Sequence, residues 1–383
     1  SVEVPYDFEP QLNVNYKKRW GNWVFNTQAE SVHFTHPDKT DHARGWRQIV
    51  YPSVSYEWRQ PGAFFIPKIG VHATQYNLSY VPSNTGVVYD KNATRALPIM
   101  SLDSGLVMER RAQWFGKNVI QTLEPRLYYA YIPYRSQNQI WNFDSALADL
   151  DFSRIYTENL FTGSDRIAQA NQITTGVTSR ILSQDTGEEL LQASVAQRYY
   201  FDEQSVTLPN TTTTNTSRKS DVLAAMSGRI APNLWAQGFV QYNMDNNKLL
   251  RTDAAIRWQP SFRQVFNLGY HENRILKEPA KTVYVATQFP VSYVSNNLYA
   301  VARLNYNLQS KKVNDVYAGF EYAHDCWIFR LVGQRTQTGN NKANNSILFQ
   351  LQLKGLGNLG QRADQTMAGQ VDGYHAADFR EEK

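Results

Sequence analysis

The chain alternates apolar and polar residues with a period of two, over about ten residues at a time, along most of its length. In residues 65–73, for example, Phe65 and Val71 share one face while Lys68 and His72 share the other. Successive side chains of a β-strand point to opposite faces. Alternating segments of about ten residues, separated by turns, are typical of transmembrane β-barrels. The pattern therefore predicts an all-β, antiparallel transmembrane β-barrel.

Seventeen such segments can be counted. They begin near residues 10, 23, 46, 63, 97, 119, 169, 188, 221, 234, 248, 264, 283, 297, 313, 327 and 346. Short connections such as 60–62 and 231–233 alternate with a second set that includes four long loops. These loops are residues 81–95, 135–168, 202–220 and 338–345. In outer-membrane barrels the short turns face the periplasm, so this alternation predicts the orientation.

The order of long and short connections also predicts a missing part. The first and the last segment both start on the long-loop side, whereas bacterial barrels have an even number of strands. We therefore expect residues 1–354 to be the C-terminal portion of one larger barrel, with an odd number of strands upstream. Residues 355–383 are then expected to form a periplasmic tail.

Composition excludes several other classes. The mean hydropathy is -0.52, and no apolar run approaches the roughly 18 residues that a spanning helix needs. The charge of +5, from 39 basic and 34 acidic residues spread along the chain, does not predict nucleic-acid binding. The histidine spacing suggests no metal site beyond a weak pair, His33 and His36, so we expect no catalytic residue, no metal and no cofactor.

Charged and polar residues on the face opposite the apolar one are predicted to line a lumen. They are Lys68, His72, Asp103, Glu109, Glu124, Arg126 and Arg198. Their signs are mixed, which favours a hydrated wall of paired charges over specific phosphate contacts.

Pro52 and Pro125 lie within alternating segments, where each removes one donor of the hydrogen-bond ladder between strands. Each marks either a weakened strand, or a bulge or shifted strand boundary.

Three runs of sequence resemble one known family. They are Leu123–Arg135 (LEPRLYYAYIPYR), Asn142–Ser145 (NFDS) and Gly163–Arg180 (GSDRIAQANQITTGVTSR). They resemble the barrel of the LptD family of lipopolysaccharide-assembly proteins, and weaker similarity extends from Glu9 to Leu356. The resemblance implies a barrel of about 26 strands, preceded by a periplasmic jellyroll. It implies a non-enzymatic translocon in the outer membrane of Gram-negative bacteria, which inserts lipopolysaccharide through a lateral opening between the first and last strands.

The resemblance also implies partners. They are lipopolysaccharide, the plug lipoprotein LptE in the lumen, the bridge protein LptA bound through the N-terminal domain, and the barrel-assembly machinery during folding. The loop 135–168 is rich in aromatic residues, which argues against disorder. We expect it to contact the plug through Trp141, Phe143, Asp144, Phe152, Phe161, Asp165 and Arg166.

Two further assignments follow from the resemblance. The last segment, Ile347 to Leu353, would be the gate strand, with Ile347, Phe349, Leu351 and Leu353 on one face. About seven residues is short against the roughly 9–11 of a full span, which predicts weak pairing with the first strand. Cys326, the single cysteine, would be half of a disulfide to the N-terminal domain; the alternative is an inert buried thiol.

Other functions remain open on the sequence alone. A diffusion porin would share the strand pattern, and an outer-membrane hydrolase would need a catalytic geometry that composition does not reveal. A soluble protein built of several sandwiches is disfavoured, because apolar faces such as Leu123, Leu127 and Tyr131 would each need a second sheet to cover them.

Overall fold

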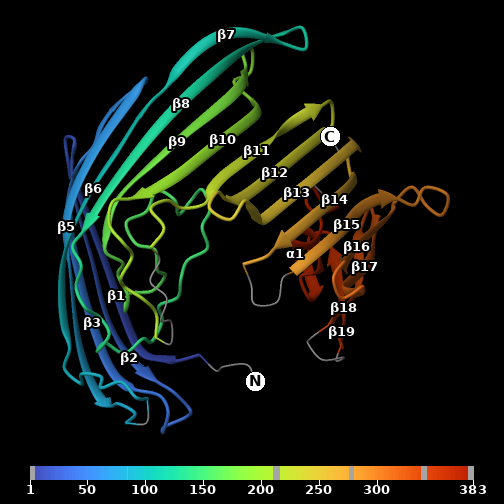
Figure 1. Ribbon diagram of the computed structural model, residues 1–383. Coiled ribbons are helices and arrows are strands. Elements are labelled where there is room, and N and C mark those ends of the chain that lie inside the picture. The colour runs from blue at the N-terminus through green and yellow to red at the C-terminus, as the bar shows by residue number, and fades with distance from the viewer. Residues whose placement is uncertain (1–4, 84, 210–215, 276–279, 338–342, 378–383) are drawn as a thin grey trace. The chain divides into compact units, whose positions relative to one another are not determined.

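The structure is a computed structural model that describes residues 5–83, 85–209, 216–275, 280–337 and 343–377. Within these ranges the chain forms an antiparallel sheet of twenty strands with one short helix, drawn in Figure 1. No helix in the described ranges is long and apolar enough to cross a membrane. The prediction of an all-β antiparallel fold is confirmed.

The chain divides into two compact units. Unit 1 comprises residues 1–110, 121–179 and 195–223, and unit 2 comprises residues 111–120, 180–194 and 224–383. The strands up to β10 are β1 (Asp7–Trp20), β2 (Trp23–Thr35), β3 (Arg44–Tyr56), β4 (Trp58–Gln60), β5 (Ala63–Tyr80), β6 (Thr94–Leu106), β7 (Met108–Trp114), β8 (Lys117–Ile132), β9 (Ala170–Ser183) and β10 (Glu189–Tyr200).

The remaining elements all belong to unit 2, apart from the first two residues of β11. They are β11 (Val222–Ala231), β12 (Leu234–Asn243), β13 (Lys248–Ser261), β14 (Gln264–Asn273), β15 (Ala280–Pro290), β16 (Leu298–Asn307), β17 (Lys312–His324), β18 (Trp327–Gln337), β19 (Ala343–Leu353), β20 (Gly357–Gly360) and the helix α1 (Ala363–Gln370).

All seventeen predicted strands are present, each starting within three residues of its predicted position. Three short strands were not predicted: β4 and β7 extend β3 and β6 after single-residue breaks, and β20 follows the last long strand. The tight turns, such as 61–62 and 232–233, alternate with the other connections as expected. The predicted loops 202–220 and 338–345 fall partly outside the described residues.

The last long strand corrects one prediction. β19 has 11 residues rather than about seven, because it begins at Ala343 and includes the polar residues Asn344, Asn345 and Ser346. These residues break the apolar alternation from which the strand start was predicted. Backbone pairing with β18 nevertheless continues to Ala343. The inference that this strand is too short for a full span is therefore wrong.

The two prolines lie inside strands, not at their ends. The pairing of β3 with β5 keeps one register on both sides of Pro52, from Val50 opposite Ala73 to Ser53 opposite Gly70, so there is neither a bulge nor a boundary. Pro125 lies in β8 beside Arg126, where the pairing with β6 ends. Both prolines thus coincide with local gaps in strand pairing, as expected for a residue without an N–H donor.

Close contact of β3 with β5 depends on Gly45. Its φ of +146° is one that L side chains rarely adopt. A Cβ at this position would also lie 2.5 Å from the carbonyl oxygen of Asn77. Immediately beyond it, Arg47 projects onto the face of the sheet where a long loop is packed.

Candidate functional site: a loop anchored on the strand wall

The connection between β8 and β9, residues 133–169, folds back onto the concave face of the unit 1 strands (Figure 1). Apolar side chains from the loop and the strands form shared clusters. Phe143 stacks on Phe34 of β2, with ring centroids 4.1 Å apart and planes 8° apart. Ile167 is buried among Leu97, Ile99 and Tyr128. The loop is therefore packed against the strand wall as part of the core of this unit.

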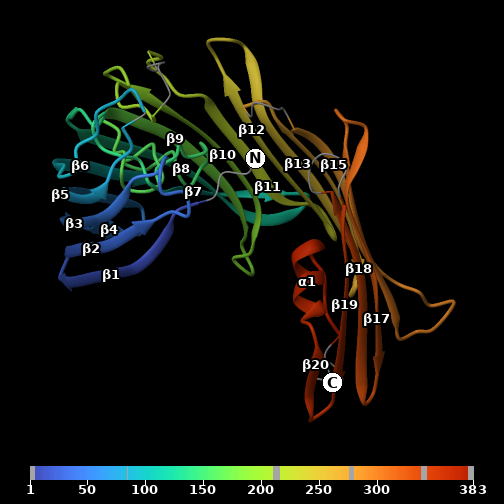
Figure 2. The same ribbon diagram turned by 90° about the horizontal axis from the view of Figure 1, so that it is seen from below.

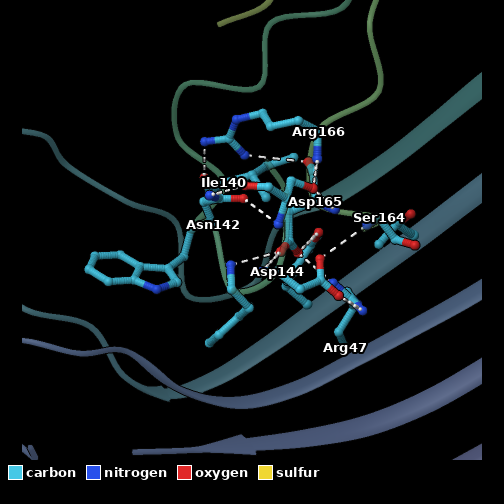
Figure 3. Close-up of polar contacts among 12 residues, drawn as sticks. Arg47, Ile140, Asn142, Asp144, Ser164, Asp165 and Arg166 are labelled. Atoms are coloured by element: carbon cyan, nitrogen blue, oxygen red, sulfur yellow. Dashed lines mark hydrogen bonds and ion pairs between the residues drawn. The ribbon is translucent and has the colours of Figure 1, made fainter. Parts of the chain in front are cut away.

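A buried arginine lies at the centre of this contact. Arg47 of β3 donates from Nη1 to Oδ1 of Asp165 at 2.9 Å and from Nη2 to Oδ2 of Asp144 at 2.6 Å (Figure 3). Its Nη2 also donates to Oε1 of Glu30 at 2.7 Å. The Arg47 side chain is 2% exposed and that of Asp165 is 0% exposed. The pair is thus fully removed from water and depends on these partners.

Asp165 accepts hydrogen bonds from four donors. Besides Arg47, the Tyr76 hydroxyl donates to Oδ1 at 2.7 Å, and the backbone N–H groups of Phe143 and Asp144 donate to Oδ2 at 2.7 and 2.9 Å. Two strands and two separate parts of the loop therefore meet at one carboxylate. Burial raises the pKa of the Asp165 carboxyl, and the charge of Arg47 opposes that shift.

Asp144 behaves differently because it is partly exposed. Burial acts to raise the pKa of its carboxyl, but the hydrogen bond and charge of Arg47 outweigh burial and hold the pKa below its usual value of 3.8. Asp144 is therefore an anion at neutral pH. With Glu30 it balances the positive charge that Arg47 and its arginine neighbours bring into the site.

Two more arginines hold the loop backbone. Arg95 of β6 donates to the carbonyl oxygens of Asp165, at 2.6 Å, and Ser164, at 2.8 Å. Arg166, within the loop, donates to the carbonyl oxygen of Ile140 at 2.8 Å (Figure 3). Because these bonds are to backbone atoms, they fix the path of the loop and do not specify its side chains.

A second anchor lies further along the loop. Glu158 accepts hydrogen bonds from the hydroxyls of Tyr51 and Ser101, each at 2.9 Å, and forms an ion pair with Lys68 at 3.1 Å. Arg198 of β10 donates to the carbonyl oxygen of Ile155 at 2.6 Å. Both anchors use strand residues on the same face of unit 1.

Some of the residues predicted to line a lumen contact the loop, and others do not. Lys68 and Arg198 bind the loop directly, and Arg126 pairs with Asp103 while stacking on Tyr156, 4.1 Å from the ring centroid. His72 is buried on the same face, 3.2 Å from the Thr74 hydroxyl. Glu124 accepts a hydrogen bond from Thr122, and Glu109 is exposed in β7. Their role in lining a lumen stays a prediction.

The residues predicted to contact a plug also differ in environment. Asp165, Arg166 and Phe143 are buried within their own chain. The other four are partly accessible: Trp141, Asp144, Phe152 and Phe161. Arg47, Arg95 and Glu158, on which the loop depends, were not singled out from the sequence. For Arg47 and Arg95 the available signal was a charge on the inward side of an alternating strand, because such a charge requires a partner. Glu158 lies in the loop, where no alternation marks it.

The predicted gate residues lie on β19, where Ile347 is 76% exposed and Phe349 is 49% exposed.

Cys326 is exposed in the turn between β17 and β18 and is a free thiol, so the alternative of a buried thiol is wrong. The sequence offers no second cysteine, so no disulfide within this chain is possible. Among the described residues, no group of three potential metal ligands is found.

Comparison with known proteins decides the family. The family model "LptD: LPS transport system D" matches residues 2–292. The chain belongs to the LptD family. Curated relatives named LPS-assembly protein LptD are 38% identical in Burkholderia thailandensis, over 97% of this chain and 48% of the relative, and 39% identical in Aromatoleum aromaticum, over 98% and 46%. The chain thus spans about half the length of the curated relatives it matches.

Family membership confirms two predictions from the sequence. The protein is located in the outer membrane of Gram-negative bacteria, and the family is described as a transport system, in line with the expectation of a non-enzymatic family. Among solved structures, the ferric enterobactin receptor of Pseudomonas aeruginosa is 9% identical with a TM-score of 0.39, covering 89% of this chain and 62% of that one. FpvA of the same species has a TM-score of 0.31. Both TM-scores are low.

The anchor predicts a specific effect of removing Arg47. The substitution Arg47→Ala leaves the Asp165 carboxylate buried without its counter-charge, which costs about 3–5 kcal/mol. We expect the loop to detach. Limited proteolysis should then cut within residues 133–169 far faster than in the unmodified protein.

The matched control is Arg229→Ala, which breaks the exposed pair with Glu188 and should cost about 0–1 kcal/mol. The double substitution Arg47→Ala with Asp165→Asn should recover part of the protection, because the amide needs no counter-charge. Equal cleavage of the Arg47 and Arg229 variants would contradict the anchor.

Proposed function

We propose that the protein to which this chain belongs inserts lipopolysaccharide into the outer leaflet of the outer membrane through a lateral opening between its first and last barrel strands. The observation that carries the proposal is membership of the LptD family, described as LPS transport system D. The physical reason is that lipopolysaccharide has acyl chains that belong in hydrocarbon and a saccharide that belongs in water. A sideways opening releases both parts at once, whereas a closed pore does not.

The strand residues fit such a path. The exposed face of β19 carries Ile347 and Phe349, which suit contact with acyl chains. The face that binds the 133–169 loop carries paired charges, which suit a hydrated lumen. A porin would also have a polar lumen, but family membership favours the translocon. Planar-bilayer recordings separate them, because a plugged translocon should conduct little.

The proposal includes the partners that the family resemblance implied. Lipopolysaccharide would arrive over LptA, bound to a domain outside this chain, and the barrel-assembly machinery would fold the barrel. LptE would occupy the lumen and contact the loop. Since Asp165 and Arg166 are buried, we assign them to positioning the loop. The contact itself falls to the accessible residues Trp141, Phe152 and Phe161.

A crosslink tests lateral exit. In the full-length protein with Cys326→Ser, the substitution Ser346→Cys in β19 should allow a disulfide with a suitably placed cysteine in the first strand. We expect this bond to block the appearance of new lipopolysaccharide at the cell surface, and reduction to restore it. Undiminished export with a complete crosslink would contradict lateral exit.

The loop contact is tested by copurification with LptE. The double substitution Phe152→Ala with Phe161→Ala removes two half-buried rings and should reduce recovered LptE about tenfold, as expected when aromatic anchors are truncated. Phe115→Ala is the control, since this ring is 82% exposed in the turn between β7 and β8. Unchanged LptE recovery in the double variant would remove the loop from the contact.

The exposed position of Cys326 permits a disulfide with another part of the full-length protein, in an oxidising compartment. We expect Cys326 to resist alkylation in the unreduced full-length protein and to be alkylated after reduction, as measured by mass spectrometry of its peptide. Alkylation without prior reduction would contradict the bridge.

A further inference from the structure

The C-terminal segment of the chain returns to the strands that precede it. After β19 the chain turns at residues 354–356 and forms β20, and α1 then lies against unit 2 (Figure 2). Residues 357–360 pair antiparallel with β19, from Gly357 opposite Leu353 to Gly360 opposite Gln350. The N–H of Gln361 adds a hydrogen bond to the carbonyl oxygen of Phe349 at 2.9 Å.

This pairing occupies one edge of β19. The other edge is paired with β18 along the whole strand. Within the part of the chain that the structure describes, β20 is the only strand on the second edge, and it covers Phe349 to Leu353. Each backbone N–H and C=O of an edge forms its ladder bond with one neighbour at a time. Another strand can therefore pair with this edge only over Ala343–Leu348.

The segment that follows β20 is held by apolar contacts. Ala363, Met367 and Val371 are fully buried against Val265, Val301 and Val332, among other residues of the unit 2 strands. Met367 lies one helical turn beyond Ala363, so both side chains lie on the same face of α1. These contacts fix the helix on the strands.

The extended part of the segment is bound through its backbone. Arg303 donates to the carbonyl oxygen of Gln370 at 2.9 Å, and Asn267 donates to that of Asp372 at 2.8 Å. The Gln288 amide both donates to the carbonyl oxygen of His375 and accepts from its N–H, at 2.9 and 3.0 Å. Three different strands thus bind backbone groups at residues 370, 372 and 375.

A buried ion cluster binds the end of the described segment. Glu321, which is 0% exposed, pairs with Arg263 at 2.6 Å and with Arg330 at 2.5 Å. The N–H of Ala377 donates to Glu321 at 3.0 Å, and Arg330 donates to the carbonyl oxygen of Ala377 at 2.7 Å. Without the segment, Glu321 and Arg330 would lose part of their hydrogen bonding, which favours the bound state.

We propose that residues 357–377 form an intrachain clip. The clip keeps the C-terminal half of the β19 edge, Phe349 to Leu353, paired with β20, so that any partner strand can pair only with Ala343–Leu348. The α1 and 370–377 contacts hold β20 in place. The consequence of the clip rests on the proposed function. If the barrel opens between its first and last strands, a pairing formed over only half of the last strand has fewer ladder hydrogen bonds to break.

Gly360 gives the clip a specific weak point. Its φ is +96°, and a Cβ there would lie 2.4 Å from the carbonyl oxygen of Phe349. Gly360→Ala should therefore release β20 from β19 without touching the remaining strands. Gly369→Ala is the matched control, because a Cβ at Gly369 in α1 would meet no side chain and no other strand within 4 Å.

A disulfide measures whether β20 is docked in the full-length protein in its membrane. In a Cys326→Ser background, Gln352→Cys and Asn358→Cys place thiols at a directly opposed pair of β19 and β20. We expect rapid oxidation of this pair. Gln352→Cys with Leu356→Cys is the control and should oxidise slowly, because Leu356 lies in the turn. Adding Gly360→Ala should slow oxidation of the first pair about tenfold, whereas adding Gly369→Ala should leave it unchanged.

Photocrosslinking tests the consequence for the edge. A photoreactive residue at Gln352 should crosslink within residues 357–377 in the Gly369→Ala protein, and should gain crosslinks to other strands of the full-length protein in the Gly360→Ala variant. Slow oxidation of the Gln352 and Asn358 cysteines, or the same crosslinks in both variants, would overturn the clip. Oxidation does not depend on lipopolysaccharide, so failure of lateral export would leave this result intact.

Discussion

Backbone pairing at strand edges is the constraint on which the rest of the structure depends. Hydrocarbon offers no hydrogen-bonding partner, so each spanning strand must have its N–H and C=O groups satisfied by neighbouring strands. Successive antiparallel strands meet this requirement along both units. Departures occur at identifiable positions, where Pro52 and Pro125 interrupt pairing and β20 covers part of the β19 edge.

Buried charges then determine what is attached to the strands. In each unit one buried ion cluster binds a segment that is not itself a long strand. Arg47, with Asp165 and Asp144, holds the 133–169 loop in unit 1. Glu321, with Arg263 and Arg330, holds the C-terminal segment in unit 2. In both, backbone groups of the bound segment complete the hydrogen bonding of the charged side chains, so neither cluster is satisfied unless its segment is in place.

The sequence predicted part of the candidate site. The approximate position of the loop and its folded character followed from long spacing and aromatic content. Lys68 and Arg198, which were predicted to line a lumen, lie on the strand face that the loop contacts. Arg47, Arg95 and Glu158 were missed, because each binds a partner far away in the sequence: Asp165 lies 118 and 70 residues from the two arginines, and Ser101 lies 57 residues from Glu158. Alternation tells which face a charge occupies, but it does not tell which distant residue neutralises it.

By itself the sequence determined the strands, the alternation of tight turns with longer connections, and the family, because each depends on local pattern or on runs of consecutive residues. The tertiary structure decided the rest. Only it extended the last strand to Ala343, since pairing with β18 continues where the apolar alternation stops. Only it brought α1 and residues 370–377 onto the unit 2 strands, since the buried carboxylate of Glu321 and the tail that it binds are separated by more than fifty residues.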